Sequence, residues 1–284
     1  MITESRACYN GVHTRVLSTA GSGVPIVLLH GFMDSAETWR ELMGQPAMAG
    51  RATLAVDMPG FGEADARAPG EILPQLDAFV DALVTELGDC VLAGNSLGAC
   101  ASVRAASRGS RAIRGVVAID EPILASHWLI RVARRGRDPL RLLPTRLRTP
   151  GALHNRAVRA GFAYLLYRHP KAADPVVVAR FADQAPDLAH VRELLVQAQQ
   201  VAVETAAGYD TTRLACPLLV VHGRRDRIIP VHASRRLHAS VPGSTLVVMP
   251  ESGHCPQLDD PAGLAGYMLP FLDATLGGRN HQAG

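Results

Sequence analysis

The sequence contains almost no lysine and little excess charge of either sign. Lys171 is the only lysine among 29 basic residues, which stand against 26 acidic ones for a net charge of +3. A near balance of this kind gives no general attraction to nucleic-acid phosphates. The preference for arginine is typical of codon bias in a GC-rich genome. We therefore expect a small-molecule substrate and no nucleic-acid partner.

Paired cysteines and long apolar runs are also missing. The five cysteines contain no C-x-x-C pair and no metal-ligand spacing, which argues against a disulfide scaffold and a structural zinc site. No apolar run approaches the roughly 18 residues of a membrane span, and the segment after Met1 lacks the apolar region of a secretory signal. We expect a soluble protein of the reducing cytoplasm, without stable membrane insertion, metal or cofactor. Assembly into a homo-oligomer stays open.

The pattern of apolar runs predicts an α/β fold. The chain has 284 residues, 48% of them hydrophobic, which suits one large domain or a core with an insertion. Asn10-Gly11 lies between two runs of β-forming residues and predicts an opening hairpin. Short apolar runs then alternate with helical stretches such as 73–87, which is typical of a mostly parallel, doubly wound sheet. The expected strands of this sheet are 25–30, 53–57, 90–93, 113–119, 217–222 and 245–249.

One long segment breaks the alternation. Between Pro122 and Gly208 there is no good strand candidate, and prolines separate several helical stretches. We expect a helical cap over 122–208, inserted after the sixth strand into a core of 1–121 and 209–284. Residues 131–171 hold eleven basic residues and one acid. Solvated helix faces explain this charge most simply, and attraction of an anionic substrate is the alternative.

Gly94-Asn-Ser-Leu-Gly98 is a G-x-S-x-G sequence between an expected strand and an expected helix. A serine on so tight a turn has a strained backbone, and side chains at the two glycines would collide with neighbouring segments. The helix that follows directs its free N–H groups, Leu97 foremost, at the place where charge develops when Ser96 attacks a carbonyl. The pattern predicts a nucleophile at Ser96.

Two other strand ends provide supporting groups. His30-Gly-Phe32 follows the strand that ends at Leu29, where a second oxyanion donor is needed, and the Phe32 N–H is the candidate. For His30 itself we prefer a structural hydrogen bond to a role in proton transfer. Asp57 ends the next strand before a turn rich in glycine and proline, and we expect it to fix that turn.

An acid and a base follow the last two expected strands. Asp226 lies in the loop after 217–222, and His254 lies in the loop after 245–249. Nucleophile, acid and base therefore occur in the order Ser96, Asp226, His254, each beyond the carboxyl end of a different strand, where an open α/β sheet places its active site. Cys255, beside the base, has no base of its own and is expected to pack.

These motifs resemble the α/β-hydrolase fold family over nearly the whole chain outside the insertion. The resemblance implies a Ser96-His254-Asp226 triad, an oxyanion hole from the Phe32 and Leu97 amides, and a helical cap that shapes the pocket. Some members carry the acid after the sixth strand, where Asp120 and Glu121 stand here. We prefer Asp226, because the residues around it match the usual acid loop through Pro230. Substrate contacts are expected from Met33, Asn95 and Trp128.

The expected reaction is hydrolysis of a carboxylic ester, thioester or lactone through an acyl-enzyme on Ser96. Relatives that cleave epoxides or carbon–halogen bonds use aspartate at this position, so those reactions are disfavoured. Asn95 before the nucleophile is found in many ring-cleavage C–C hydrolases as well as in carboxylesterases. Cleavage of a diketo acid is therefore the second hypothesis, and a ligand receptor on the same fold is the third.

Overall fold

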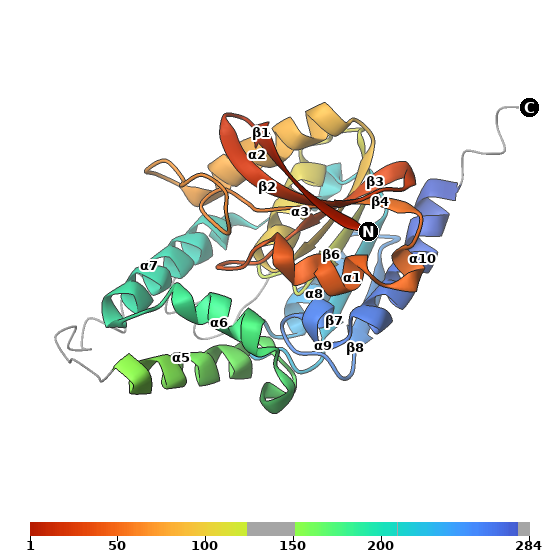
Figure 1. Ribbon diagram of the computed structural model, residues 1–284. Coiled ribbons are helices and arrows are strands. Elements are labelled where there is room, and N and C mark those ends of the chain that lie inside the picture. The colour runs from red at the N-terminus through yellow and green to blue at the C-terminus, as the bar shows by residue number, and fades with distance from the viewer. Residues whose placement is uncertain (124–150, 209, 278–284) are drawn as a thin grey trace, which may run out of the picture.

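The computed structural model describes residues 1–123, 151–208 and 210–277. Its strands form one eight-stranded sheet in the order β1-β2-β4-β3-β5-β6-β7-β8 (Figure 1). The strands are β1 (Ile2–Tyr9), β2 (Val12–Thr19), β3 (Ser22–Leu29), β4 (Arg51–Val56), β5 (Cys90–Asn95), β6 (Ile113–Ile119), β7 (Leu218–Gly223) and β8 (Thr245–Met249). The expected α/β class and every expected strand are confirmed.

β2 is antiparallel to its neighbours β1 and β4, and the other strand pairs are parallel. The predicted hairpin joins β1 and β2 with Tyr9 opposite Val12. Its two turn residues, Asn10 and Gly11, have φ angles of 50° and 77°. These left-handed conformations are what a two-residue hairpin turn needs, and asparagine and glycine adopt them most readily.

Helices cover both faces of the sheet because alternate strand residues point to opposite sides. Val27 and Leu29 of β3 belong to a core cluster with α2, α3 and α8, whereas Ile26 and Leu28 pack with α1 and α10. Continuous apolar strands are therefore buried on both sides, as the sequence predicts. The helices named here are α1 (Arg40–Met43), α2 (Ile72–Leu87), α3 (Leu97–Ser107), α8 (His232–Ser240) and α10 (Pro261–Gly277).

The described part of the segment between β6 and β7 is helical. It forms α5 (Gly151–Leu166), α6 (Pro175–Asp183) and α7 (Leu188–Glu204), which lie together at one end of the sheet (Figure 1). Asp174 and Asp187 cap α6 and α7 by accepting backbone N–H groups of Val176 and His190. Apolar side chains of α5 and α6 pack with Met33 and Cys255, which belong to the loops after β3 and β8.

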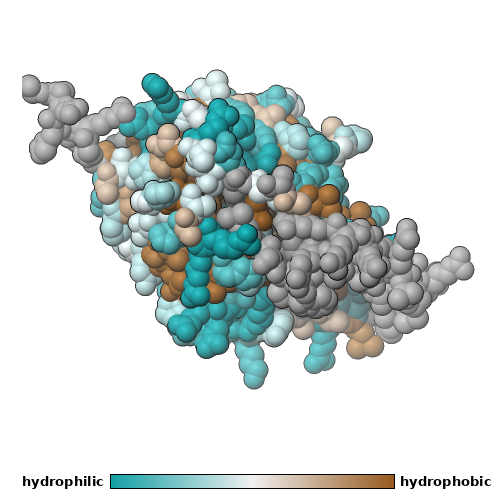
Figure 2. Space-filling view, turned by 180° about the vertical axis from the view of Figure 1, so that it is seen from behind, coloured by the Kyte–Doolittle hydropathy of each residue, from teal (hydrophilic) through white to brown (hydrophobic). Residues whose placement is uncertain are grey.

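Most large apolar side chains exposed on the described residues lie on these three helices. They are Leu153, Tyr164 and Leu165 on α5, Val176 on α6, and Leu195, Val196 and Val203 on α7. From behind, hydrophilic surface surrounds several separate apolar groups (Figure 2). None of the described helices has the length and apolar character needed to cross a bilayer.

Asp57 fixes the turn after β4, as the sequence predicts. Its buried carboxylate accepts hydrogen bonds from Arg15 Nε at 3.0 Å, from the Ala36 amide at 2.6 Å and from the Glu63 amide at 2.8 Å. A Cβ atom at Gly62, which has φ of 56°, would lie 2.3 Å from Asp57 Cγ. The carboxylate therefore ties β2, the loop after β3 and the loop after β4 together.

We expect Asp57→Ala to lower the free energy of unfolding by about 2 to 4 kcal/mol, because it removes the acceptor of Arg15 Nε and of two amides, although Arg15 keeps its ion pairs with Glu37 and Glu63. Glu63→Ala is the matched control, since it removes a 45% exposed acid from the same arginine and should cost at most about 1 kcal/mol. Urea unfolding of both variants measures the difference. Equal losses would contradict the structural role of Asp57.

Candidate active site

Ser96 occupies a strained turn between β5 and α3. Its φ and ψ angles are 52° and −112°, a conformation that side-chain-bearing residues rarely adopt. The Ser96 N–H donates to the carbonyl of Ile119 on β6 at 2.8 Å, and the Ser96 carbonyl accepts from the Cys100 N–H at 3.0 Å. Both bonds hold the turn, so the conformation of Ser96 is imposed by its neighbours.

The glycines on either side of Ser96 allow this turn by close approach. A Cβ atom at Gly94 would lie 2.2 Å from the carbonyl carbon of Gly98. A Cβ atom at Gly98 would lie 2.1 Å from the carbonyl oxygen of Leu29, at the end of β3. Any side chain at these two positions would collide with the backbone, as the sequence predicts. At Gly98 the backbone it would meet is that of β3, so the turn lies directly against the end of this strand.

The loop after β3 lies against Ser96. A Cβ atom at Gly31 would be 3.6 Å from Ser96 Cβ, and Phe32 packs edge-to-face on Phe61 with ring centroids 5.5 Å apart. Leu97 is the first residue of α3, so its N–H has no intrahelical acceptor. The two amides predicted as oxyanion donors therefore belong to segments that meet beside Ser96.

His30 has the structural role that the sequence favours. Its Nδ1 bonds the carbonyl of Gly31 at 2.7 Å, and its Nε2 accepts the Met58 N–H at 2.9 Å. Complete burial lowers the pKa of His30 to about 4, so the ring is neutral at physiological pH. It links the ends of β3 and β4.

Asp226 and His254 form a buried pair. His254 Nδ1 lies 2.7 Å from Asp226 Oδ2, and the side chains are 7% and 1% exposed. Asp226 Oδ1 accepts the amides of Ile228 and Ile229 at 2.7 and 2.9 Å. Burial alone would raise the pKa of Asp226, but the charge and hydrogen bond of His254 and the other donors lower it overall. An ionised Asp226 thus holds the His254 ring by its Nδ1 atom, so Nε2 is the ring nitrogen left for contact with the nucleophile.

Asn95 connects this pair to the nucleophile turn. Its Nδ2 donates to the backbone carbonyl of His254 at 3.0 Å, although 159 residues separate them. The side chain is almost fully buried, and its contact with substrate stays a prediction.

Among the described residues no hydrogen bond joins the Ser96 hydroxyl to the His254 ring; such bonds often tighten only when substrate binds. Cys255 is buried, which raises the pKa of its thiol well above the usual value, in agreement with packing.

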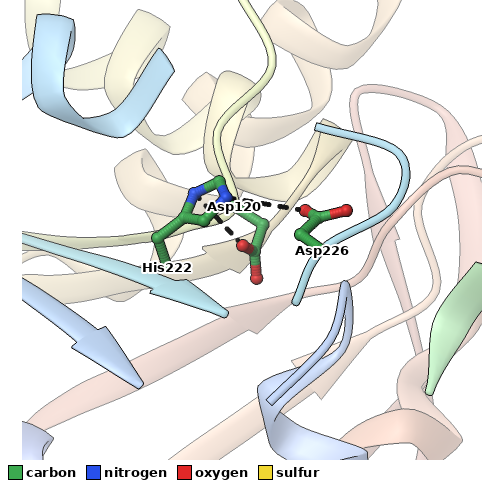
Figure 3. A group of neighbouring side chains, drawn as sticks. All are labelled: Asp120, His222 and Asp226. Carbon is green, nitrogen blue, oxygen red and sulfur yellow. Dashed lines mark ion pairs between the residues drawn. The ribbon is translucent and has the colours of Figure 1, made fainter. Parts of the chain in front are cut away.

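A second acid lies beside the pair. Asp120, directly after β6, is fully buried, and its Oδ1 accepts the Gly223 N–H at 2.9 Å. Asp120, His222 and Asp226 each place one possible metal-ligand atom within 4.8 Å of the others (Figure 3). His222 Nδ1 lies 2.8 Å from Ser234 Oγ, and its Nε2 lies 3.1 Å from the carbonyl of Ile229. Hydrogen bonds with Ser234, Ile229 and Gly223 thus fix the orientation of the His222 ring and the Asp120 carboxyl group.

A cavity of about 720 Å³ opens beside the loop after β3. Met33 lines it, together with residues of the loop after β4 and of α6 and α7, whereas Ser96 and His254 are not among its lining residues. Met33 has φ of 63°, and its carbonyl accepts a hydrogen bond from Gln184. Met33 therefore lies at the wall of this cavity, directly after Phe32, and Trp128 lies outside the described residues.

Asp34, at the wall of this cavity, was not singled out by the sequence. It is 6% exposed, its Oδ1 accepts the Ser35 N–H at 2.8 Å, and its Oδ2 has no partner among the described residues. Burial, only partly opposed by hydrogen bonds from Ser35 and Thr38 and by Arg180, raises the pKa of Asp34 to about 7. A carboxylate five residues after the end of β3 carries no sequence signal for this, because the charge of Arg180 and the wall of this cavity come from a segment far along the chain.

Comparisons with known proteins agree with this geometry. The model of the alpha/beta hydrolase family matches residues 26–266. A 2-hydroxymuconate semialdehyde hydrolase of Pseudomonas putida is 28% identical over 272 residues, which cover 90% of this chain and 89% of that protein. Two solved structures, a serine hydrolase involved in carbazole degradation and a thermophilic esterase from Thermogutta terrifontis, align with TM-scores of 0.75 and 0.68 at 20% and 21% identity. They cover 96% and 97% of this chain, and 100% and 99% of theirs.

We expect Asp34 to make stability depend on pH. The raised pKa means that the folded chain keeps a proton that the unfolded chain releases above about pH 4. The free energy of unfolding should therefore fall as pH rises from about 4 to about 7, by at most about 1.4 kcal/mol per unit. Asp34→Asn removes this dependence, so its melting temperature relative to wild type should rise over that range.

Thermal unfolding of wild type and Asp34→Asn from pH 5 to pH 8 measures this effect. Asp183→Asn is the control, because it removes an exposed carboxylate from the same cavity. Its difference from wild type should vary much less with pH. A pH-independent difference for Asp34→Asn would contradict the prediction.

Proposed function

This chain belongs to the alpha/beta hydrolase family, and we propose that it is a serine hydrolase that cleaves a carboxylic ester, thioester or lactone. The observation that supports this most is the joining of three strand ends. Asn95, next to Ser96, bonds the backbone of His254, whose ring bonds Asp226. A nucleophile on a strained turn beside a histidine oriented by a carboxylate is the arrangement that acyl transfer needs.

In the proposed mechanism, Ser96 Oγ attacks the acyl carbon while His254 Nε2 takes its proton. Asp226 stabilises the resulting imidazolium, and the amides of Phe32 and Leu97 bind the oxyanion. Collapse of this intermediate expels the alcohol or thiol, which receives the proton from His254. Water then attacks the acyl-enzyme by the same route, which releases the acid and restores Ser96.

We further propose that residues 122–208 act as a cap on a core of 1–121 and 209–284. Gln184, directly after α6, bonds the carbonyl of Met33 in the loop that carries Phe32. Met33 also packs against α5 and α6 in one apolar cluster. This placement supports a substrate contact at Met33. The contribution of Trp128 and the role of the basic residues of 131–171 are parts of the same proposal.

Hydrolysis of a chromogenic ester series from acetyl to dodecanoyl tests the esterase function. We expect turnover by wild type, loss of turnover to background in Ser96→Ala, and about a 10⁴-fold lower kcat in Asp226→Asn. Ser102→Ala is the matched control, because Ser102 is a buried serine of the same helix whose hydroxyl donates to the Gly98 carbonyl. Its activity should stay close to wild type. Turnover that persists in Ser96→Ala would exclude the proposed nucleophile.

Cleavage of a C–C bond is the second candidate. It is favoured by the similarity, over 90% of this chain, to a 2-hydroxymuconate semialdehyde hydrolase. We expect this function if purified protein bleaches the absorbance of a ring-cleavage dienoate faster than it hydrolyses any ester of the series. No Ser96-dependent turnover on either substrate class would favour a ligand receptor on the same fold.

A further inference from the structure

Two acids from neighbouring strands meet behind the proposed catalytic base. Asp120 follows β6 and Asp226 follows β7, and their side chains are 0% and 1% exposed. One oxygen of each acid and one nitrogen of His222 lie within 4.8 Å of one another (Figure 3). Two full negative charges so close in a buried site would repel strongly. One of the two carboxyl groups must therefore hold a proton.

The hydrogen bonds indicate which acid is ionised. Asp226 accepts three donors, two amides at Oδ1 and His254 Nδ1 at Oδ2, which leaves one acceptor position at Oδ2. Asp120 Oδ1 accepts the Gly223 amide, whereas its buried Oδ2 has no partner among the described residues. A proton on Asp120 Oδ2 would give that atom an acceptor in Asp226. A proton on Asp226 instead of Asp120 would lie on an oxygen atom that already accepts a hydrogen bond.

The groups that face Asp120 provide no compensating positive charge. His222 Nδ1 lies 3.2 Å from Asp120 Oδ1 and 2.8 Å from Ser234 Oγ, and its Nε2 lies 3.8 Å from Asp226 Oδ2 and 3.1 Å from the carbonyl of Ile229. Because the Ile229 carbonyl can only accept, we assign the ring proton to Nε2, which leaves Nδ1 to accept from Ser234. Burial lowers the pKa of His222, so it stays neutral. Burial and the charge of Asp226, with a smaller contribution from Asp259, raise the pKa of Asp120 well above its usual range. His254 bonds Asp226, and the neighbouring Cys255 is a neutral buried thiol.

We propose that Asp120 is a positioning residue, a neutral carboxylic acid whose O–H donates to the remaining lone pair of Asp226 Oδ2. This role of Asp120 rests on the function proposed above for Asp226 and His254. Asp120 keeps its proton throughout the reaction, and its hydrogen bond makes Asp226 less basic. The Nδ1 proton therefore stays on His254 when the imidazolium forms. Asp120 has φ of 50°, a strained conformation for aspartate that fixes where its carboxyl group points.

Three variants separate this role from the alternatives. Asp120→Leu removes the donor at similar volume, and we expect kcat to fall about 10- to 100-fold with little change in KM. The acidic limb of the kcat/KM profile should move to higher pH, because a more basic Asp226 stabilises protonated His254. Asp120→Asn retains an N–H donor that cannot ionise, so it should lose less than about tenfold. Ser234→Ala, which touches His222 and not Asp226, should leave the acidic limb in place.

Infrared spectroscopy tests the proton itself and does not need activity. The difference spectrum of wild type minus Asp120→Asn at mildly alkaline pH should contain the C=O band of a protonated carboxylic acid. Absence of this band, or a loss in Asp120→Asn as severe as in Asp226→Asn, would show that Asp120 is ionised and overturn the proposal. An Asp120→Leu variant that folds with wild-type kcat and pH profile would overturn it too. A protein with the band but no Ser96-dependent turnover would contradict only the proposed function.

Discussion

The close crossing of α3 over the end of β3 is the constraint on which the site depends. No side chain fits at Gly98, because its Cβ atom would lie 2.1 Å from the carbonyl oxygen of Leu29. This contact sets the distance between the nucleophile turn and the loop of Gly31 and Phe32, both of which contribute amides to the proposed oxyanion hole. The hydrogen bond from Ser96 N–H to Ile119 then connects the turn to β6. The strain at Ser96 is thus balanced by contacts with two neighbouring strands.

The parallel sheet also explains why two acids meet at one end of the sheet. Neighbouring strands β6 and β7 end side by side, so the residues that follow them, Asp120 and the loop of Asp226, converge beside His222. Backbone amides favour Asp226 for the charge, since Ile228 and Ile229 donate to it in a tight turn. Asp120 meets one amide, that of Gly223. Asp226 therefore differs from Asp120 both in its backbone donors and in its direct bond to the His254 ring.

Local signals predict the strands and the site motifs well, because each depends on a short segment. The runs 113–119 and 245–249 coincide with β6 and β8, and Asn10-Gly11 forms the expected turn. What the sequence does not reveal depends on pairs far apart in the chain. Asn95 bonds a carbonyl 159 residues away, and Asp34 lines a cavity together with residues of α6. Likewise, the preference for Asp226 rests on motif likeness alone until the partners of both acids are known.

The helices between β6 and β7 share anchors with the loops that hold the proposed catalytic groups. Arg227, next to Asp226, donates to the carbonyls of Tyr164 and Tyr167 at the end of α5. Asp259 accepts the amides of Gly253 and Arg168, so it joins the loop of His254 to the same helix end. A shift of α5 would therefore strain both the acid loop and the base loop. Because α5 and α6 also pack on Met33, substitutions in these helices that alter the pocket should change the alignment of acid and base as well, and selectivity and rate should vary together in such variants.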